Sequence, residues 1–328
     1  MAQCVSCRRR CMVRSIALLG ALLVASSINA QNFPTRPVRV VVPFAPGGGT
    51  DLLARTLAVK LAVAWSQQVL VDNRPGGGTV IGSDLVAKSA PDGHTLLLTA
   101  NTHSTNPALH AKLPYDTLRD FAGVTQIAAA PMLLTTHPAL PARNVRELIA
   151  LAKAKPGQLS FGTSGNAGPQ HLAGELFKTT AGIAMVHVPY KGSAPAITDL
   201  IAGQTQLTFG STFTVLPHAS SGRLRALAVT TAKRVPALQL PTIAEDGLPG
   251  YEATTWYGIF TVGGTPAAMI NKLNTDIARA LKLPDVADRL ARDGSDAVAS
   301  EPAVFDAFVR AEIEKVRHIV KSSHMRLD

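Results

Sequence analysis

At 328 residues the chain is long enough to fold as two domains with full hydrophobic cores. Its formal net charge is +10, but the lysines and arginines are scattered and form no basic run interleaved with aromatics, which argues against nucleic-acid binding. All three cysteines, Cys4, Cys7 and Cys11, lie near the N-terminus, so the rest of the chain can hold no disulfide and no cysteine-ligated metal.

The first thirty residues have the pattern of a secretory leader. An arginine cluster between Arg8 and Arg14 precedes an apolar stretch from Ile16 to Ala25, and the small residue Ala30 follows a few positions later. The apolar stretch is too short for a stable membrane anchor, and no cysteine follows it to carry a lipid. We predict a signal peptide over 1–30, cleaved near Ala30, and export to the periplasm as a soluble protein; the adjacent arginines leave the export route open.

Beyond the leader, short β-branched runs alternate with helical patterns, which favours an α/β fold with parallel strands. In chain order, strands are expected at 38–42, 69–71, 95–99, 132–136, 159–162, 184–188, 207–209 and 224–230. Helices are expected after the first strand, where Leu53, Leu57 and Leu61 form an apolar stripe, and at 145–154, 171–180 and 194–202. The segment 251–262 is expected to be extended, and 266–320 mostly helical.

No flexible linker divides the chain into two halves. Two lobes joined by strands that cross between them would leave no linker in the sequence. The segments 124–130 and 251–260 are the candidates for such crossing strands.

Three consecutive glycines, Gly47, Gly48 and Gly49, lie between the first predicted strand and its helix. The first N–H groups of a helix have no partner within the helix and carry the positive end of its dipole. Glycine leaves these groups open to a ligand. The segment therefore predicts an anion-binding loop, and the anion could be a cofactor phosphate, a substrate or a transported solute.

Nucleotide motifs do not fit this loop or the next one. A dinucleotide fingerprint needs a third glycine where Leu52 stands, and the P-loop spacing of Gly77 and Gly82 is followed by Ser83 and Asp84 in place of the lysine and hydroxyl residue. The histidines show no metal-ligand spacing. We expect no cofactor and no metal.

Ser164 lies in a segment, 161–166, that is similar to a nucleophile elbow. The glycine required two residues after the serine is replaced by Asn166, and His171 falls on the next predicted helix instead of late in the chain. Ser164 is therefore expected to be a hydrogen-bond donor. A secreted serine hydrolase remains the alternative.

Hydroxyl and amide donors recur in loops that follow predicted strands. Each loop by itself is best explained as a turn or a helix cap. Together, the loops predict a polar cleft at the carboxyl ends of the strands. Besides the glycine loop with Thr50, these residues are Asn101, Thr102, Thr163, Ser164, Gly165, Asn166, Gly210 and Ser211.

Asp51 has two possible roles. In the first turn of a helix a carboxylate is favoured by the dipole, which is a structural role. Alternatively, it accepts a hydrogen bond from a ligand ammonium or hydroxyl. Arg55, one turn later, either pairs with Asp51 or points to solvent.

Several segments together resemble the substrate-binding proteins of tripartite tricarboxylate transporters, the Bug family of bacteria. The resemblance covers the whole chain after the leader and is carried by Pro43-Phe44-Ala45-Pro46-Gly47-Gly48-Gly49-Thr50-Asp51, Val71-Asp72-Asn73-Arg74-Pro75-Gly76-Gly77-Gly78, Ala90-Pro91-Asp92-Gly93-His94-Thr95, Val188-Pro189-Tyr190-Lys191-Gly192, Thr163-Ser164-Gly165 with His171, and Trp256-Tyr257-Gly258 with Gly264-Thr265-Pro266.

This resemblance implies a two-lobed periplasmic-binding-protein fold of type II-like form, each lobe a sheet flanked by helices, with lobe 1 at 31–127 plus 256–328 and lobe 2 at 128–255. It implies a monomeric receptor, not an enzyme, that delivers a small carboxylate to a large and a small membrane subunit. Such proteins hold a ligand carboxylate with two facing loops, which here would be Phe44 to Asp51, including Ala45, and Thr163 to Asn166. A binding protein that senses or scavenges without a transporter is a further alternative.

One departure from the family pattern concerns the ligand class. The strand at 207–209 often leads into an aspartate in the family, whereas Gly210, Ser211 and Thr212 follow it here. The loss of an acidic group favours a plain carboxylate over an amino acid.

Overall fold

The computed structural model describes residues 33–110 and 112–323, with side chains described as far as residue 317. The predicted signal peptide lies outside these residues. The described strands are β1 (Val38–Val42), β2 (Val69–Asn73), β3 (Thr95–Ala100), β4 (Phe121–Thr136), β5 (Ser160–Thr163), β6 (Val186–Pro189), β7 (Leu207–Ser211), β8 (Arg225–Val229), β9 (Thr254–Val262) and β10 (Asp296–Ala297). The helices are α2 (Gly49–Trp65), α3 (Val80–Ala87), α4 (Thr102–Leu109), α5 (Val145–Ala154), α6 (Pro169–Ala181), α7 (Ser193–Ile201), α8 (Thr212–Ser220), α9 (Ala267–Leu281), α10 (Pro284–Arg292) and α11 (Pro302–Ser323), with a short 3-10 turn η1 (Gly77–Thr79).

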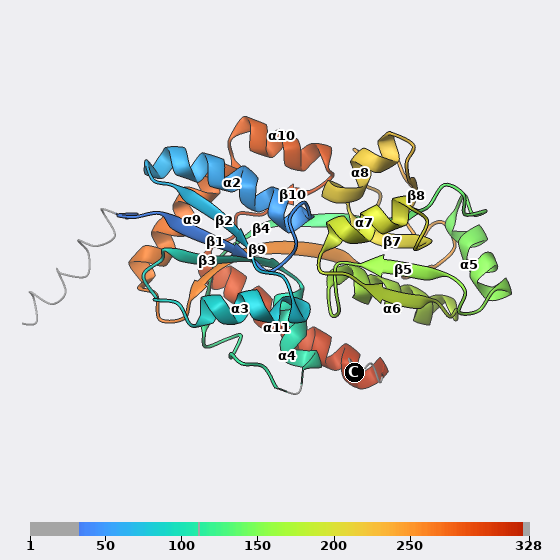
Figure 1. The fold of residues 1–328 in the computed structure, drawn as a ribbon, viewed down its shortest axis with the longest axis horizontal. Coiled ribbons are helices and arrows are strands. Elements are labelled where there is room, and N and C mark those ends of the chain that lie inside the picture. The colour runs from blue at the N-terminus through green and yellow to red at the C-terminus, as the bar shows by residue number, and fades with distance from the viewer. Residues whose placement is uncertain (1–32, 111, 324–328) are drawn as a thin grey trace, which may run out of the picture.

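The strands form one long, mixed sheet that runs through two halves of the molecule (Figure 1). Its order is β2-β1-β3-β9-β4-β7-β5-β6, and β8 and β10 also pair with β4. In the first half, α2, α9 and α10 cover one face and α3 and α11 cover the other. In the second half, α5 and α6 cover one face and α7 and α8 the other. Helices on both faces of a sheet are the α/β architecture that the alternating pattern predicts.

Strands β4 and β9 connect the two halves. Residues 121–131 of β4 pair with β9, whereas residues 132–136 pair with β7 and β8. The sequence indicates both crossing segments but places a separate strand at 132–136, and the structure instead contains one strand of 16 residues. Pro131, which lacks an N–H, lies where the pairing changes.

The predicted parallel pairing is found in only part of the sheet. Pairs β1–β2, β1–β3, β5–β6 and β5–β7 are parallel, but β9 is antiparallel to both β3 and β4, and β4 is antiparallel to β7. A strand that returns from the other half must run against the strands that lead toward it. The crossing strands therefore make the sheet mixed.

The first half has the core that the apolar pattern predicts. Leu53, Leu57 and Leu61 are buried along one side of α2, against the valines of β1. Helix α3 begins at Val80, because the glycine run before it and Thr79 adopt positive φ angles that a helix cannot contain.

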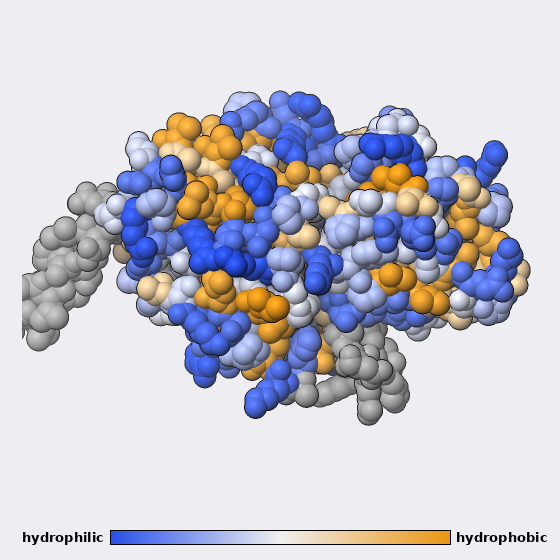
Figure 2. Space-filling model, viewed as in Figure 1, coloured by the Kyte–Doolittle hydropathy of each residue, from blue (hydrophilic) through white to orange (hydrophobic). Residues whose placement is uncertain are grey.

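The surface of this half is mostly hydrophilic, with some hydrophobic side chains exposed over α2 (Figure 2). Among them are Val59 and Val63 of α2, which are 63% and 79% exposed.

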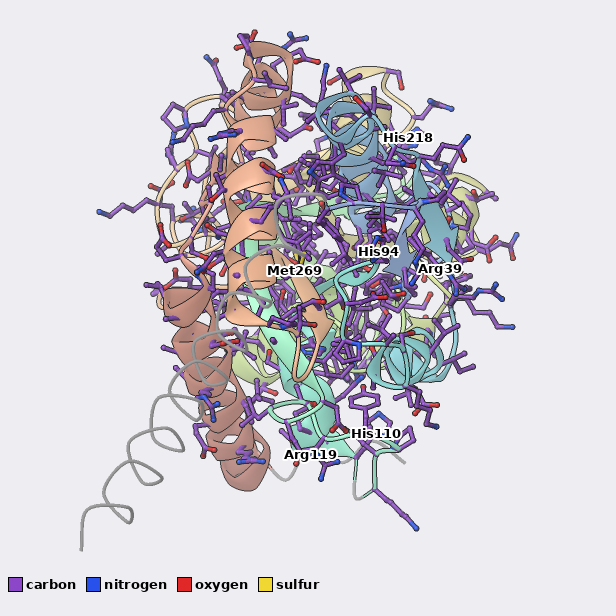
Figure 3. All side chains as sticks on the ribbon, turned by 90° about the vertical axis from the view of Figure 1, so that its left-hand side faces the viewer. Arg39, His94, His110, Arg119, His218 and Met269 are labelled. Atoms are coloured by element: carbon purple, nitrogen blue, oxygen red, sulfur yellow. The ribbon has the colours of Figure 1, made fainter. Side chains whose placement is uncertain are left out.

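In the end-on view of Figure 3, His94 lies between Met269 of α9 and Arg39 of β1. In the described residues, no helix combines the length and apolarity needed to cross a membrane.

Candidate ligand-binding site

A small pocket lies between the two halves, beside the crossing strands. Its free volume is about 20 Å³, room for one or two water molecules, so the halves are closed over it. The residues that line it are Phe44, Gly48, Gly49, Thr50, Ala100, Met132, Ser164, Pro169, Gln170, Ser193, Ser211, Thr255 and Tyr257.

Four helices begin at this pocket. Its lining includes Gly49 at the start of α2, Pro169 at the start of α6, Ser193 at the start of α7, and Ser211 directly before α8. None of these four N-termini is capped by the side chain of its own N-cap residue. The first-turn N–H groups of a helix have no helical partner, and four positive dipole ends converge on one space. The pocket is therefore suited to an anion.

Glycine suits positions 47 and 49 of the first loop for different physical reasons. Gly47 has a φ of +83°, a conformation that other residues rarely adopt. At Gly49 the backbone is ordinary, but a Cβ atom would lie 2.9 Å from the Tyr257 hydroxyl and 3.2 Å from Ser211 Oγ. Gly49 thus permits the close approach of the two halves.

Asp51 faces its own loop and does not line the pocket. Its carboxylate, 2% exposed, accepts hydrogen bonds from Gly47 N (2.9 Å), Arg55 Nε (3.0 Å) and Asn73 Nδ2 (3.0 Å). Burial alone would raise the pKa of Asp51, but the hydrogen bonds from Arg55, Gly47 and Asn73 outweigh it and hold the pKa below its usual range. Of the two roles open for Asp51, these contacts favour the structural one.

Gln170 connects the donor loops of the second half. Its Oε1 atom accepts a hydrogen bond from Ser164 N, and its Nε2 atom donates one of 3.1 Å to Ser193 Oγ. Gln170 is 4% exposed and lines the pocket. One side chain therefore sets the relative position of two pocket walls.

A stacked histidine pair supports the loop at 163–166 from behind. The rings of His171 and His187 are 3.8 Å apart and nearly parallel, and His187 Nε2 lies 2.7 Å from Thr163 Oγ1. Burial lowers the pKa of both histidines, that of His187 to about 3, so the pair is neutral near neutral pH.

Within the described part of the chain, no base is hydrogen-bonded to Ser164 Oγ. His171 Nδ1 accepts a hydrogen bond from Ala167 N at 3.2 Å, and its Nε2 atom lies 3.7 Å from Glu175 Oε1. Both nitrogens of this histidine are directed to groups other than the serine. A nucleophilic serine needs a hydrogen-bonded base, and this histidine does not act as one for Ser164.

The two halves are also joined by direct hydrogen bonds. Ala45 N donates to Lys191 O at 2.9 Å, and the Tyr257 hydroxyl donates to Ser211 Oγ at 2.9 Å. Burial raises the pKa of Tyr257 to about 12, so its hydroxyl stays protonated and can donate. These bonds hold the glycine loop and the crossing strand against the second half.

The structure brings only part of the predicted site residues to the pocket wall. Those that line it are Phe44, Gly48, Gly49, Thr50, Ser164 and Ser211. The others lie in the supporting loops and elements: Ala45, Gly47 and Asp51 in or beside the glycine loop, Asn101 and Thr102 at the start of α4, Thr163, Gly165 and Asn166 around Ser164, His171 on α6, and Gly210 within β7. Asn101 does not reach the pocket because its amide oxygen accepts hydrogen bonds from Thr255 Oγ1 and Trp256 N.

Other pocket residues carry weaker signals in the sequence. Ser193 follows the segment Tyr190-Lys191-Gly192, and Tyr257 lies in another segment of the family pattern, so the sequence carries a signal at both positions. Gln170 has no such signal beyond its place at a helix start. Ala100, Met132, Pro169 and Thr255 are of types that signal no ligand contact. Among residues 33–110 and 112–323, no cluster of three or more His, Cys, Asp or Glu side chains could hold a metal.

Comparison with known proteins agrees with this geometry. Residues 53–325 match the model of the tripartite tricarboxylate transporter family receptor. The chain is 36% identical to the protein BugT of Bordetella pertussis over 325 residues, which are 96% of this chain and 99% of BugT. It is similar in structure to Rpa4515 of R. palustris solved with adipate (38% identity, TM-score 0.86, 90% of this chain and 99% of that one). It is also similar to MatC of Rhodopseudomonas palustris solved with bound malate (31% identity, TM-score 0.84, 88% and 100% of the two chains).

The fold is that of the periplasmic binding proteins, with two halves joined by crossing strands. The chain belongs to the tripartite tricarboxylate transporter receptor family, which includes the Bug proteins.

Proposed function

We propose that this protein captures a small carboxylate, a di- or tricarboxylate or a related organic acid, between its lobes and delivers it to the membrane subunits of a tripartite transporter. The observation that carries the proposal is the meeting of four uncapped helix N-termini at one pocket. A ligand carboxylate there would accept hydrogen bonds from first-turn N–H groups of both lobes. Two similar structures, solved with adipate and with bound malate, support the same ligand class.

The donors of the pocket are sufficient for a useful affinity. Micromolar binding corresponds to about 8 kcal/mol, and hydrogen bonds to a charged group contribute roughly 1.5 to 3 kcal/mol each before the losses of association. On the order of five such bonds are therefore needed, and the four helix starts supply them. Among the residues that the structure describes, no lysine or arginine lines the pocket, which suits a receptor that must release its ligand.

For the lobes we propose the boundaries 31–127 plus 256–328 and 128–255. The change of strand pairing within β4 and the separate hydrophobic cores on either side of it support this division. An open form would bind the ligand first on the loop from Phe44 to Asp51, and closure would then add Ser164, Gln170 and Ser193. We propose that the monomeric closed form is what a large and a small membrane subunit recognise.

Calorimetry with a panel of mono-, di- and tricarboxylates tests the ligand class. Adipate, malate and citrate represent the proposed class, and phosphate, a sugar phosphate and a neutral sugar serve as comparison ligands. We expect saturable binding of at least one carboxylate and a matching rise of the melting temperature. If only the phosphates bind, the anion pocket stands but the ligand class is wrong.

Delivery to a transporter needs a separate test in the cell. Uptake of the bound carboxylate should fall when this protein or either membrane subunit is deleted. Uptake that persists without the membrane subunits would favour a sensing or scavenging protein. Incubation with generic esters tests the hydrolase alternative, because turnover abolished by Ser164→Ala would contradict a pure receptor.

A further inference from the structure

A second glycine run, Gly76 to Gly78, lies between β2 and α3 in the first lobe. In the part of the chain that the structure describes, none of its residues lines the anion pocket. The three φ angles are +127°, +56° and +60°, which other residues rarely adopt. The fully buried Asn106 holds the run in place, since its Nδ2 atom donates to Gly78 O at 3.0 Å and to Thr79 Oγ1 at 3.1 Å. The run is thus a fixed part of the surface of the first lobe.

Gly78 is the point at which this run touches the second lobe. A Cβ atom on Gly78 would lie 3.5 Å from the carbonyl oxygen of Asn166. Asn166 belongs to the loop that carries Ser164, which lines the pocket. On Gly77, a Cβ atom would meet only side chains of α3 in its own lobe, as far as the described residues go. One glycine of the run therefore faces the other lobe, and its neighbour does not.

Gly192 of the second lobe packs even more closely against the first lobe. Its φ is +148°, and a Cβ atom there would lie 2.9 Å from both the N and the Cβ atom of Ala45. Cβ atoms in proteins do not approach other atoms so closely, so a side chain at this position would push the lobes apart. Lys191, directly before Gly192, accepts a hydrogen bond of 2.9 Å from Ala45 N.

Both glycine contacts control pocket walls that they do not form. Asn166 moves with Ser164, and Gly192 directly precedes Ser193, whose Oγ atom accepts from Gln170. The extent of closure decides how near these walls come to the glycine loop of the first lobe. A hydrogen bond of ordinary length that is stretched by about 1 Å is lost. A small error in closure would therefore remove donors of the second lobe from the ligand.

We infer that Gly78 and Gly192 are stops that set the closed position of the lobes and, through it, the affinity for the ligand. The inference rests on the proposed function of the pocket. Both glycines are positioning residues, because they touch the opposite lobe and not the ligand. A side chain at either position favours the open form, in which the donors of the second lobe are out of reach. The second glycine run thus has a role in closure although it fits no nucleotide motif.

Spin labels can measure closure without any ligand. All three cysteines precede the predicted cleavage site, so the exported protein accepts labels only where cysteines are introduced. Val63→Cys on α2 and Val186→Cys on β6 are suitable, because these side chains are 79% and 48% exposed and lie in different lobes. Double electron–electron resonance on this labelled background should show a population of short distances that corresponds to the closed form, and adipate or malate should increase it.

Gly78→Asn tests the first stop. Asparagine visits positive φ more readily than most residues, so the loop should keep its shape. We expect the short-distance population to shrink, and calorimetry with adipate and malate should show a loss of about tenfold or more in affinity. Gly77→Asn is the matched control, because its φ is nearly the same and its position is exposed on its own lobe. This control should match the background in both measurements.

Gly192→Ala tests the second stop and keeps the inference testable if Gly78→Asn does not fold. The new methyl group would lie 2.9 Å from Ala45, so the same two effects are expected. Gly247→Ala is its control in the same lobe. The φ of Gly247 is +133°, close to that of Gly192, but the nearest atoms to a Cβ there belong to the exposed Arg146 of the same lobe. The control should leave the label distances unchanged.

Three results would overturn the inference. The first is a closed population that is equal in each variant and its matched control. The second is a loss of affinity with an unchanged closed population, which would mean that the glycines act on the pocket directly. The third is a background protein without short distances, with or without a carboxylate. If neither adipate nor malate binds but both variants still reduce the closed population, the ligand proposal fails and the closure stops stand.

Discussion

Gly47 donates a backbone hydrogen bond of 2.9 Å to Asp51 Oδ2, which ties the glycine loop to the first turn of the helix that follows it. A carboxylate in an anion-binding loop would repel its ligand if it faced the pocket. Here it faces inward, where Arg55 and Asn73 also bind it. The acidic residue thus fixes the loop geometry, and the pocket wall is left to Gly48, Gly49 and Thr50.

Asp51→Asn should destabilise the protein and weaken carboxylate binding. The amide keeps the shape of the side chain but cannot accept from Gly47, Arg55 and Asn73 together, so we expect a loss of about 2 to 3 kcal/mol in the free energy of unfolding. Urea unfolding and calorimetry measure the two effects. Arg55→Gln is the control, because this side chain is 53% exposed and its pair with Asp51 should contribute less than about 1 kcal/mol.

Asp51→Asn should also change how the stability of the protein depends on pH. Because the pKa of Asp51 is lowered in the folded state, the carboxylate stabilises the protein above its ordinary pKa of about 4, and this contribution is lost as the pH falls below that value. Asp51→Asn should therefore lose less stability than the wild type on acidification below about pH 4. Identical acid dependence in the two proteins would contradict this role.

Gly49→Ala should impair closure without harming the fold. The new methyl group would lie 3.2 Å from Ser211 Oγ of the other half, and the Tyr257 hydroxyl of its own half, at 2.9 Å, would have to shift, whereas the backbone conformation suits alanine, which also favours a helix by about 1 kcal/mol. We expect at least a tenfold loss of ligand affinity with little change in thermal stability. Gly49→Ala with Ser211→Ala removes the obstacle on the other half and should recover part of the affinity relative to Ser211→Ala alone. A purely additive double mutant would argue against this clash.

Gln170→Glu should abolish binding of carboxylates. The change is isosteric and keeps an acceptor for Ser164 N, but it places a negative charge in the pocket wall, so we expect at least a hundredfold loss of affinity. Gln206→Glu makes the same change in the second half, where the side chain accepts from Ser160 and does not line the pocket. Calorimetry should show near-normal affinity for that control, and equal losses in both variants would contradict an anion pocket.

His103→Phe should make the protein more resistant to acid. His103 on α4 is 1% exposed, both of its ring nitrogens lack a partner among the described residues, and it packs against Phe121 and Phe260 at centroid distances of 4.8 and 4.1 Å. Burial lowers the pKa of His103 to about 3, so the folded state resists a proton that the unfolded state accepts. Stability is therefore lost as the pH falls from about 6.5 toward 3, by up to about 1.4 kcal/mol per pH unit.

Urea unfolding at pH 7 and pH 5 measures this effect. The phenylalanine variant should have a smaller difference in the free energy of unfolding between the two conditions than the wild type. His187 still contributes to the remaining pH dependence, because burial lowers its pKa to about 3 as well. Phe121→Leu changes the same aromatic cluster but keeps the histidine, so its pH dependence should match that of the wild type.

The sequence by itself determined the α/β class, the crossing strands and the glycine loop before α2. These depend on local periodicity and on glycine at a strand-to-helix junction, which are properties of neighbouring residues. It also marked Ser164 and Ser211, because donors that follow strands gather at one edge of a sheet.

Only the tertiary structure decided which residues face the pocket and which support it. Asp51 turns inward because Gly47, Arg55 and Asn73 converge on it, and Asn73 is 22 residues away in the chain. Gln170 and Tyr257 enter the pocket because α6 and β9 are brought there by strand pairing between distant segments. Local pattern does not encode such contacts, since they depend on the closed arrangement of the two halves.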